Sequence, residues 1–541
     1  MGGGSYLQWA EDEQLRSNIQ SVVDGIASLR EPNGWTYAFN ESDIDSNNNP
    51  DYCAAWLTRG LLDAHRAGIF GAGELNRAAI SLFNNHSRLA WFLPPNGGPE
   101  PSLPYPSGFD NVTDGGFGNG PGHMIYIQFQ GMIKHSLTAL DDDGAQADID
   151  ILESLYLEQW WLHALLNNDT YHAIWHRQFF SHKYEVTAFE AILDLYVLTG
   201  NRTYYQAVIN AWHMLRQGWM LPGGSLALNE GPYYPPGSYF IGFTGTAVGL
   251  VDEEERSSER EEVERAGGGD DPYFHSKCMF HPGSGGSSSS YRSPLQQLRS
   301  AAERGRPHSS LPNANDPPTG ELCGSVFWTF LNKRLHQLQP REEYAAEMER
   351  SIINVGISAL GPPGSGGEGP NGTGIRYFAN QHKQKQNPSM HASCCEGQGS
   401  RLFGSLPKFL YSLQGDDNDT RAVYVDIYAA SLLTIRVHGQ TATLEVDTAW
   451  PYAAQVIVTL TLLSASSSLL LILRMPAWLA DFVPITVNGQ VCPSTGVPGA
   501  FLSTRMMHRG SDVLLFALRI PVYVCFRQLH QRDSSIWLGG R

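Results

Sequence analysis

Four side chains in two separate motifs could bind one soft metal cation. The segment "TGELCGS" supplies Glu321 and Cys323, and "HASCCEGQGSR" supplies Cys394 and Cys395. Zinc takes thiolate and carboxylate ligands in a tetrahedral shell, and a bound dication keeps a thiol ionised near neutral pH, where a free cysteine is mostly protonated. The two motifs therefore predict a zinc site of three sulfurs and one carboxylate. A thiolate held in this way can also act as a nucleophile.

An ordinary structural role for these cysteines is the alternative. Cysteine is often buried as a small apolar residue, and a vicinal pair whose third partner lies 71 residues upstream is not a standard zinc-finger spacing. The local context favours the metal site. Cys323 precedes a predicted helix over 324–338, and Gly397 and Gly399 predict a sharp turn before an amphipathic stretch over 400–413. Both motifs are expected at loop-to-helix junctions, which can converge at one end of a helical barrel or bundle.

The first two-thirds of the chain has the apolar periodicity of helices. An apolar stripe at Ile19, Val22, Val23, Ile26 and Leu29 marks the first helix. Further helices are predicted over 52–67, 73–90, 122–138, 147–166, 182–199, 203–217, 324–338, 342–360 and 400–413, with Gly200-Asn201 ending the one at 182–199. Loops rich in Gly, Pro, Trp and Tyr join them. This pattern favours an α/α barrel with its site at one rim.

The pattern changes after residue 413. Short runs with β-branched residues or alternating polarity, such as "TATLEVDTAW" and "QVIVTLTLL", are separated by turn signals such as Asn488-Gly489. They predict a terminal β-sandwich domain. The segment 242–318 fits neither pattern, because it is a charge run followed by a serine- and glycine-rich tract, and we interpret it as a mostly disordered insertion. His275, Cys278 and His281 within it have ligand-like spacing but a low-complexity context.

Composition excludes several classes of partner. The chain has 541 residues, which predicts two or three domains, and 37 basic against 54 acidic residues give a formal charge of −17. This charge repels phosphate backbones and anionic lipid, so neither nucleic acid nor a membrane is expected as a partner. Seven cysteines are an odd number without a stapled module, so reduced thiols are expected. No signal peptide or membrane span is expected, yet seven N-x-Ser/Thr sequons leave a secretory route open.

Several segments, taken in order, resemble glycoside hydrolase family 127, the β-L-arabinofuranosidase family. They are "TGELCGSVFWTFLNKRLHQL", "SIINVGISAL", "GIRYFANQH" and "SCCEGQGSRLFGSLPKFLYSL", followed by "VYVDIYAAS" and "PITVNGQV". The resemblance extends from about residue 10 to about residue 525, with the insertion excluded. The Glu-x-Cys and Cys-Cys motifs are its most specific parts.

The resemblance implies a multidomain α plus β protein, an (α/α)6 barrel followed by a β-sandwich. On this chain the barrel would take 1–241 and 319–414, the insertion 242–318, and the sandwich 415–541, whose tail departs from the family pattern. The family also implies retaining hydrolysis of β-L-arabinofuranosides, a carbohydrate substrate and a Zn²⁺ ion. Glu321, Cys323, Cys394 and Cys395 would be the zinc ligands, and Cys394 the nucleophile.

The family also has a glutamate acid/base near a Gly-Gly turn and a Tyr/Pro-rich loop. The segment "GGSLALNEGPYYPPGSYF" places Glu230 there, which makes it our choice. Glu303, before "LPNANDPPTGE", is the rival, since its distance from Glu321 is typical of the family although its surroundings lack the aromatic and glycine residues. His182 resembles a histidine that borders the sugar site, and Tyr377 corresponds loosely to an aromatic pocket residue.

Two other function classes stay open. In the first, the chain is a noncatalytic glycan-binding α/α-barrel protein in which zinc only joins two loops. In the second, it is a metal-independent barrel enzyme such as a lyase or an unsaturated-uronate hydrolase. Anionic substrates of that second class call for an arginine-lined pocket, which the acidic composition does not favour.

Overall fold

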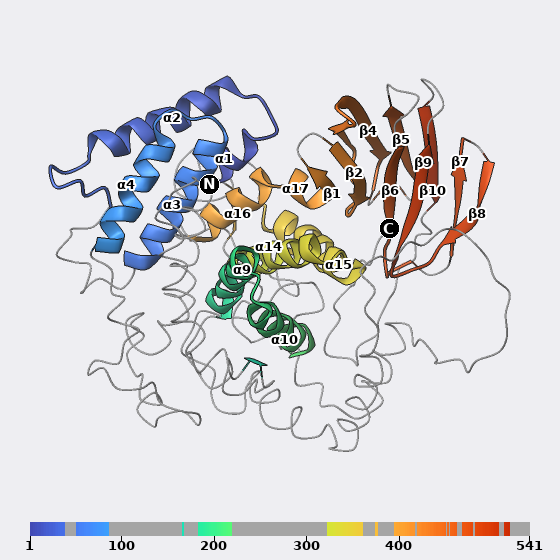
Figure 1. Cartoon of the computed structure of the whole chain (residues 1–541), viewed down its shortest axis with the longest axis horizontal. Coiled ribbons are helices and arrows are strands. Elements are labelled where there is room, and N and C mark those ends of the chain that lie inside the picture. Colours follow the sequence, from blue (N-terminus) through green and yellow to red (C-terminus); the bar gives the residue numbers. More distant parts are fainter. Residues whose placement is uncertain are drawn as a thin grey trace, which may run out of the picture. The chain divides into compact units, whose positions relative to one another are not determined.

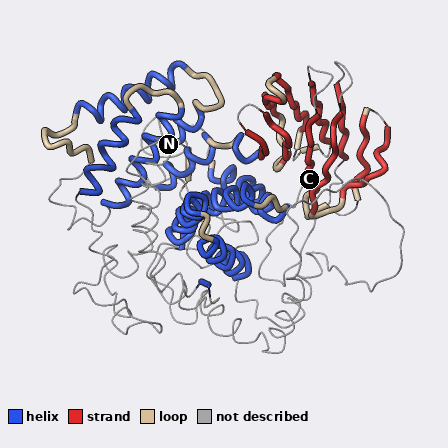
Figure 2. The backbone as a smooth tube through the Cα atoms, in the orientation of Figure 1, coloured by secondary structure: helices blue, strands red, loops and turns tan. Residues whose placement is uncertain are grey.

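The computed structural model describes residues 1–37, 50–85, 165–166, 182–218, 322–360, 374–376, 394–416 and, with short gaps, 419–519. Within these ranges the helices occupy the chain up to residue 410, and the strands of the sheets follow from residue 411 (Figure 1). Figure 2 shows the same division, with helices in blue and strands in red. A helical region followed by a β-rich region was predicted from the change of pattern near residue 413, and this coarse arrangement is confirmed.

The described helices agree closely with several predicted ranges. Gly200 has a φ of 72° and ends α9, as predicted, because glycine adopts this left-handed conformation without strain. Asn201 then begins α10 by accepting a hydrogen bond from the backbone N–H of Thr203. The helices are α1 (Gly2–Tyr6), α2 (Glu13–Ser28), α3 (Pro50–Arg66), α4 (Ala72–Asn85), α9 (His182–Thr199), α10 (Arg202–Gly218), α14 (Leu322–Leu338), α15 (Glu342–Ser351), the π-helix η5 (Ile352–Ile357), α16 (Cys394–Gly404) and α17 (Pro407–Leu410).

Three predictions about the helices need correction. The stretch 400–413 is not one helix, because α16 ends at Gly404, α17 is a single turn, and the first strand begins at Tyr411. Gly397 and Gly399 do not form a turn before the helix but lie inside α16. The stripe on α2 is also incomplete: Val23 is buried, whereas Val22 is 60% and Leu29 is 82% exposed.

Glycines at the start of the chain allow very close helix packing. Helix α1 contacts both α3 and α16. A Cβ on Gly4 would lie 2.8 Å from the backbone of Asp63 in α3, and one on Gly404 would overlap the backbone oxygen of Gly2. The side chain of Trp9 adds a hydrogen bond from its Nε1 to the oxygen of Gly404 at 2.8 Å. These contacts fix one side of α16, the helix that begins with the cysteine pair.

The strands form two sheets. A four-stranded sheet has the order β1-β2-β6-β9, and a six-stranded sheet has the order β3-β4-β5-β10-β7-β8. Strands β2 and β6 pair in parallel, and the other pairs are antiparallel. The strands are β1 (Tyr411–Asp416), β2 (Asp419–Val425), β3 (Ser431–Val437), β4 (Gln440–Thr448), β5 (Gln455–Leu462), β6 (Ser468–Met475), β7 (Val483–Val487), β8 (Gln490–Gly496), β9 (Ala500–Met507) and β10 (Val513–Arg519).

One apolar core takes side chains from both sheets. Val423 and Leu471 come from the four-stranded sheet, and Leu444 and Val458 come from the six-stranded sheet; all four are 0% exposed. The alternation of polarity read from the sequence therefore does place one face of these strands inside. The predicted turn signal is confirmed, since Asn488 has a φ of 49° between β7 and β8.

Several predicted segments lie outside the described residues. They include the helix over 122–138, nearly all of that over 147–166, and the insertion 242–318 with its His275, Cys278 and His281. Among the described helices, none is both long enough and apolar enough to cross a membrane.

Candidate functional site

Two of the four predicted metal ligands meet in the structure. Cys323 is the second residue of α14, and Cys395 is the second residue of α16. Their Sγ atoms lie 3.1 Å apart, although the residues are separated by 72 positions in the sequence. Both side chains are buried, and neither sulfur takes part in a disulfide. The two motifs therefore lie together at these sulfurs.

The separation of the two sulfurs lies between that of a disulfide and that of two thiolates on one zinc ion. Two thiolates on one tetrahedral zinc, each about 2.3 Å from the metal, are about 3.8 Å apart, whereas disulfide sulfurs are about 2.05 Å apart. The observed 3.1 Å lies between these values, so in this structure the two sulfurs are closer together than two ligands of one zinc ion would be. Within the described ranges no three His, Cys, Asp or Glu side chains gather as a metal site, and two of the four predicted ligands lack described side chains.

Both sulfurs lie at the N-terminal ends of helices. The backbone N–H groups of a first helical turn lack partners within the helix, and the helix dipole places partial positive charge there. This charge favours the thiolate over the thiol. Helices α14 and α16 present such ends to the same place, where Cys323 and Cys395 lie.

A glycine allows this convergence. A Cβ on Gly399 would lie 2.9 Å from Cγ2 of Ile375 and 3.1 Å from Cδ2 of Leu322, the first residue of α14. A side chain at this position would push the start of α14 away from α16. The glycine that was predicted to bend the chain thus serves instead as a site of close helix packing.

The other predicted site residues are described in part or not at all. Cys394 begins α16 and His182 begins α9, but for both only the backbone is described. Glu321, one residue before α14, and Glu230 and Tyr377 lie outside the described ranges. The roles predicted for these side chains stay predictions.

The far half of α14 is anchored to the β-rich region by a buried polar cluster. The ammonium of Lys333 donates hydrogen bonds to the carbonyl oxygen of Tyr411 at 2.8 Å and to Ser412 Oγ at 2.7 Å. It also lies 3.4 Å from Asp426 Oδ2, and Nε2 of His336 is 2.9 Å from Asp426 Oδ1. The helix that carries Cys323 is therefore held at both ends.

Electrostatics favours the ionised form of the Asp426 carboxyl in this cluster. Burial raises the pKa of the Asp426 carboxyl, but the hydrogen bond from His336 and the charge of Lys333 outweigh it, so the pKa lies below its ordinary value. Burial lowers the pKa of the Lys333 ammonium, and the charge and hydrogen bond of Asp426 oppose this. Removing the carboxylate would leave Lys333 buried without its counter-charge.

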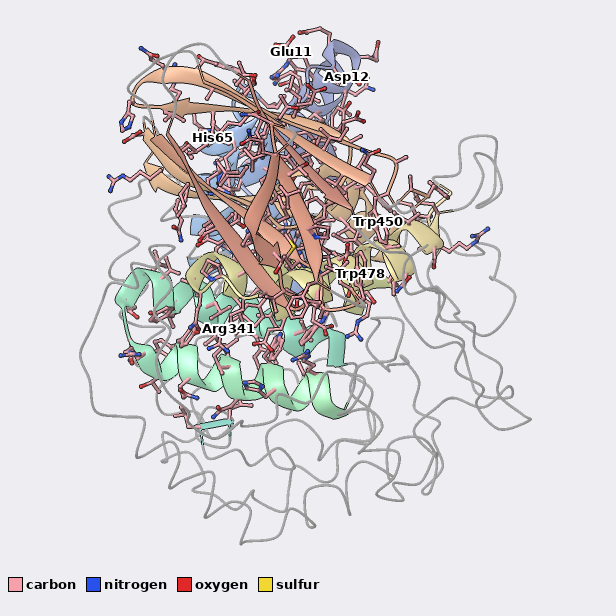
Figure 3. All side chains as sticks on the ribbon, turned by 90° about the vertical axis from the view of Figure 1, so that its right-hand side faces the viewer. Glu11, Asp12, His65, Arg341, Trp450 and Trp478 are labelled. Atoms are coloured by element: carbon pink, nitrogen blue, oxygen red, sulfur yellow. The ribbon has the colours of Figure 1, made fainter. Side chains whose placement is uncertain are left out.

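A second buried cluster joins α15 to β6. The Arg474 side chain is fully buried, and its guanidinium bonds Glu342 and Glu349, each at 3.0 Å. Trp478 donates from Nε1 to Glu349 at 2.9 Å and stacks on Trp450 with ring centroids 4.7 Å apart, a pair labelled in Figure 3. Burial alone would lower the pKa of Arg474, but the two carboxylates raise it above its ordinary value.

Sequence reasoning missed both clusters. Lys333 and His336 lie in an otherwise apolar and buried helix, which is a signal that could have marked them. Arg474 likewise interrupts the apolar run of β6. A charged residue in a buried run needs a partner, but the partner's identity depends on the tertiary fold.

Known proteins similar to this chain point to one family. A "Non-reducing end beta-L-arabinofuranosidase" from Bifidobacterium longum subsp. longum is 23% identical over 237 residues, which are 41% of this chain and 33% of that protein. The match thus spans about a third of the curated relative's length.

Solved structures agree at the level of the fold. A family 127 β-arabinofuranosidase has a TM-score of 0.60 at 16% identity, and the match covers 96% of this chain and 69% of that one. A family 127 β-L-arabinofuranosidase from Geobacillus stearothermophilus T6 has a TM-score of 0.57 at 16% identity, with 98% of this chain and 72% of that one covered.

The family's own sequence models match two adjacent parts of the chain. The model described as "Beta-L-arabinofuranosidase, GH127 catalytic domain" matches residues 275–408, which include both cysteine motifs. The model described as "GH127 middle domain" matches residues 422–520, which hold most of the strands. The catalytic match begins inside the segment 242–318. The sequence of this chain is thus similar to glycoside hydrolase family 127 over residues 275–408 and 422–520.

Proposed function

We propose that this chain is a retaining glycoside hydrolase that releases β-L-arabinofuranosyl or a related sugar. The observation that carries the proposal is the 3.1 Å separation of the sulfurs of Cys323 and Cys395. The match of the catalytic-domain model over both cysteine motifs supports the same conclusion. At the level of the fold, we extend the proposal to an (α/α)6 barrel for the helical region and a β-sandwich for the two sheets.

The donor set suits zinc. Glu321, Cys323, Cys394 and Cys395 would hold the ion, which when bound would keep the cysteine sulfurs as thiolates near neutral pH. The two helix N-termini add partial positive charge beside this anionic set of ligands.

The chain's own residues would then divide the reaction into two displacements. In the first, Sγ of Cys394 attacks the anomeric carbon, a C–S bond forms, and the glycosidic C–O bond breaks while a glutamic acid protonates the departing alcohol. In the second, the same glutamate takes a proton from water, the water oxygen bonds the anomeric carbon, and the C–S bond breaks. Two inversions at one carbon give net retention. His182 and Tyr377 would border the sugar.

Two glutamates compete for the acid/base role. Glu230 has the glycine and aromatic context for which it was chosen. Glu303 lies inside the range 275–408 matched by the catalytic-domain model, whereas Glu230 lies outside it. The matched range therefore favours Glu303. The leaving-group dependence of the two Glu→Gln variants distinguishes Glu303 from Glu230.

The central test is hydrolysis of an aryl β-L-arabinofuranoside. We expect Cys394→Ser to lower kcat/KM at least about a thousandfold, because the nucleophile is lost. Cys53→Ser, outside the predicted ligand set, is the matched control and should retain activity. Unchanged turnover in Cys394→Ser would favour a noncatalytic role for the metal motif, and activity that survives complete metal removal would favour the metal-independent class.

The acid is identified by leaving-group dependence. We expect Glu303→Gln or Glu230→Gln, whichever residue is the acid, to lose about 10²–10⁴-fold on an alkyl glycoside. The loss should be much smaller on a dinitrophenyl glycoside, whose leaving group needs no proton. The same variant should accumulate a protein adduct heavier by one pentosyl group, located on Cys394 by mass spectrometry.

A further inference from the structure

A buried arginine lies on the same helix as the cysteine pair. The side chain of Arg401 in α16 is 3% exposed, and its Nη2 lies 3.1 Å from Oε2 of Glu190 in α9. Its guanidinium carbon lies 3.6 Å from the ring centroid of Phe330 in α14 and 5.7 Å from that of Trp56 in α3. One cation thus contacts three other helices, including the helix of Cys323.

The spacing along the helices places this cluster about two turns beyond the cysteine motifs. Arg401 follows Cys394 by seven residues, and Phe330 follows Cys323 by seven residues. Seven residues are about two turns, so the members of each pair are about 10 Å apart along their helix. Cys395, whose sulfur meets that of Cys323, lies six residues before Arg401. Because α14 and α16 touch at the sulfurs and again at Phe330 and Arg401, the two helices run parallel.

Helix α9 runs in the same direction as α14 and α16, and it begins at the same height along their common axis. Asp194 of α9 and Arg334 of α14 form a second ion pair at 2.9 Å. Asp194 lies four residues after Glu190 on α9, and Arg334 lies four residues after Phe330 on α14. Helices α9, α14 and α16 begin eight, eight and seven residues before Glu190, Phe330 and Arg401, respectively. The three helices therefore begin at the same level, about 10–12 Å from the cluster.

A buried ion pair at this position adds little stability over an apolar contact. Desolvation of a buried ion pair often outweighs its attraction, and well-packed apolar replacements are often as stable. Burial lowers the pKa of Arg401, while the carboxylate of Glu190 opposes this shift. The planar guanidinium stacks on an aromatic ring and also bonds a carboxylate. These two contacts fix the orientation of α16 relative to its neighbours in a way that an apolar contact does not.

We propose that Arg401 is a positioning residue whose contacts with Glu190 and Phe330 set the register of α16 against α9 and α14, and so bring the cysteine pair to Cys323. The inference rests on the proposed function for its catalytic consequence. The juxtaposition of the sulfurs themselves does not depend on zinc and is measured separately.

The test compares full-length variants. The double variant Arg401→Met with Glu190→Leu removes both charges, and Arg401→Lys keeps the charge without the planar fork. The control is Arg216→Met in α10, because Arg216 also stacks on an aromatic ring, Trp212 at 4.9 Å, and also pairs with a glutamate, but is 40% exposed. Zinc affinity is measured by competition with a chromophoric chelator, and thermal unfolding is measured on the metal-free protein.

We expect the double variant to lose at least tenfold in zinc affinity while its unfolding temperature stays within a few degrees of wild type. Arg401→Lys should fall between the double variant and wild type, and Arg216→Met should match wild type. Zinc affinity that is unchanged in both Arg401 variants would overturn the proposal. If the double variant fails to fold, Arg401→Lys alone decides between these outcomes.

A metal-independent readout separates this proposal from the proposed function. In a Cys394→Ser background, phenylarsine oxide, which bridges two close sulfurs, should join the peptides of Cys323 and Cys395. Adding Arg401→Met with Glu190→Leu should abolish this bridge even if the chain binds no zinc. A bridge that persists in the double variant would contradict the proposed register control.

Discussion

Asp426 provides the sharpest test of how the β-rich region supports α14. Its carboxylate faces the ammonium of Lys333 and the imidazole of His336, and all three groups are buried. Asp426→Asn keeps the shape but leaves Lys333 without its counter-charge. Removing one partner of a buried pair costs about 3–5 kcal/mol. At about 2–4 °C per kcal/mol for a cooperative unit of about 150–250 residues, the unfolding temperature should fall by roughly 6–20 °C.

The same substitution should change the pH dependence of stability. The pKa of Asp426 is lower in the folded chain than its ordinary value, so the carboxylate stabilises the fold above that ordinary value, and the contribution is lost as pH falls through the folded pKa. Wild type should therefore lose stability below about pH 4 more steeply than Asp426→Asn.

The assay is thermal unfolding followed by tryptophan fluorescence and far-ultraviolet circular dichroism at pH 7 and along a series down to pH 3. Asp447→Asn, at an exposed position of β4, is the control and should stay within about 0.5 kcal/mol of wild type. If Asp426→Asn unfolds at the wild-type temperature and loses stability in acid as wild type does, Asp426 does not stabilise α14 in this way.

Three further predictions concern single residues. Gly404→Ala should destabilise the chain by about 1–3 kcal/mol, because a Cβ would overlap the oxygen of Gly2. Urea unfolding measures this loss. Gly25→Ala is the control and should not destabilise the chain, because the space around its Cβ is open. Asp12→Ala should cost about 1 kcal/mol, since Asp12 caps α2 through the N–H of Leu15 at 2.8 Å, and equal stability would argue against the cap. Gly399→Val should weaken zinc binding by separating α16 from Leu322, and a chelator competition that finds wild-type affinity would contradict this packing role.

Local signals in the sequence predicted much of the fold. Gly200 ended α9, Asn488 marked a hairpin, and the apolar spacing of Val326, Leu331 and Leu335 predicted α14, because each depends on neighbours within a few residues. The sequence predicted that Cys323 and Cys395 lie close together only because both occur in motifs with metal-binding side chains at the start of predicted helices. Their 3.1 Å separation is a tertiary fact.

Features that depend on the partner helix were not predictable. Gly397 and Gly399 have the local character of a turn, but Gly399 lies in α16 because Ile375 and Leu322 fill the space of its missing side chain. Arginine and lysine are usually exposed on helices, and only the fold reveals against which carboxylates Arg401 and Lys333 are buried. Val22 and Leu29 continue an apolar stripe that the described neighbours do not cover.

The most direct measurement is the metal content of the purified chain by mass spectrometry, alongside Cys323→Ser and Cys395→Ser. We expect about one zinc per wild-type chain and a loss of at least tenfold in affinity in either variant, with glycosidase activity lost in parallel. A wild-type chain that hydrolyses the arabinofuranoside with no metal bound, or variants that bind zinc as tightly as wild type, would contradict it.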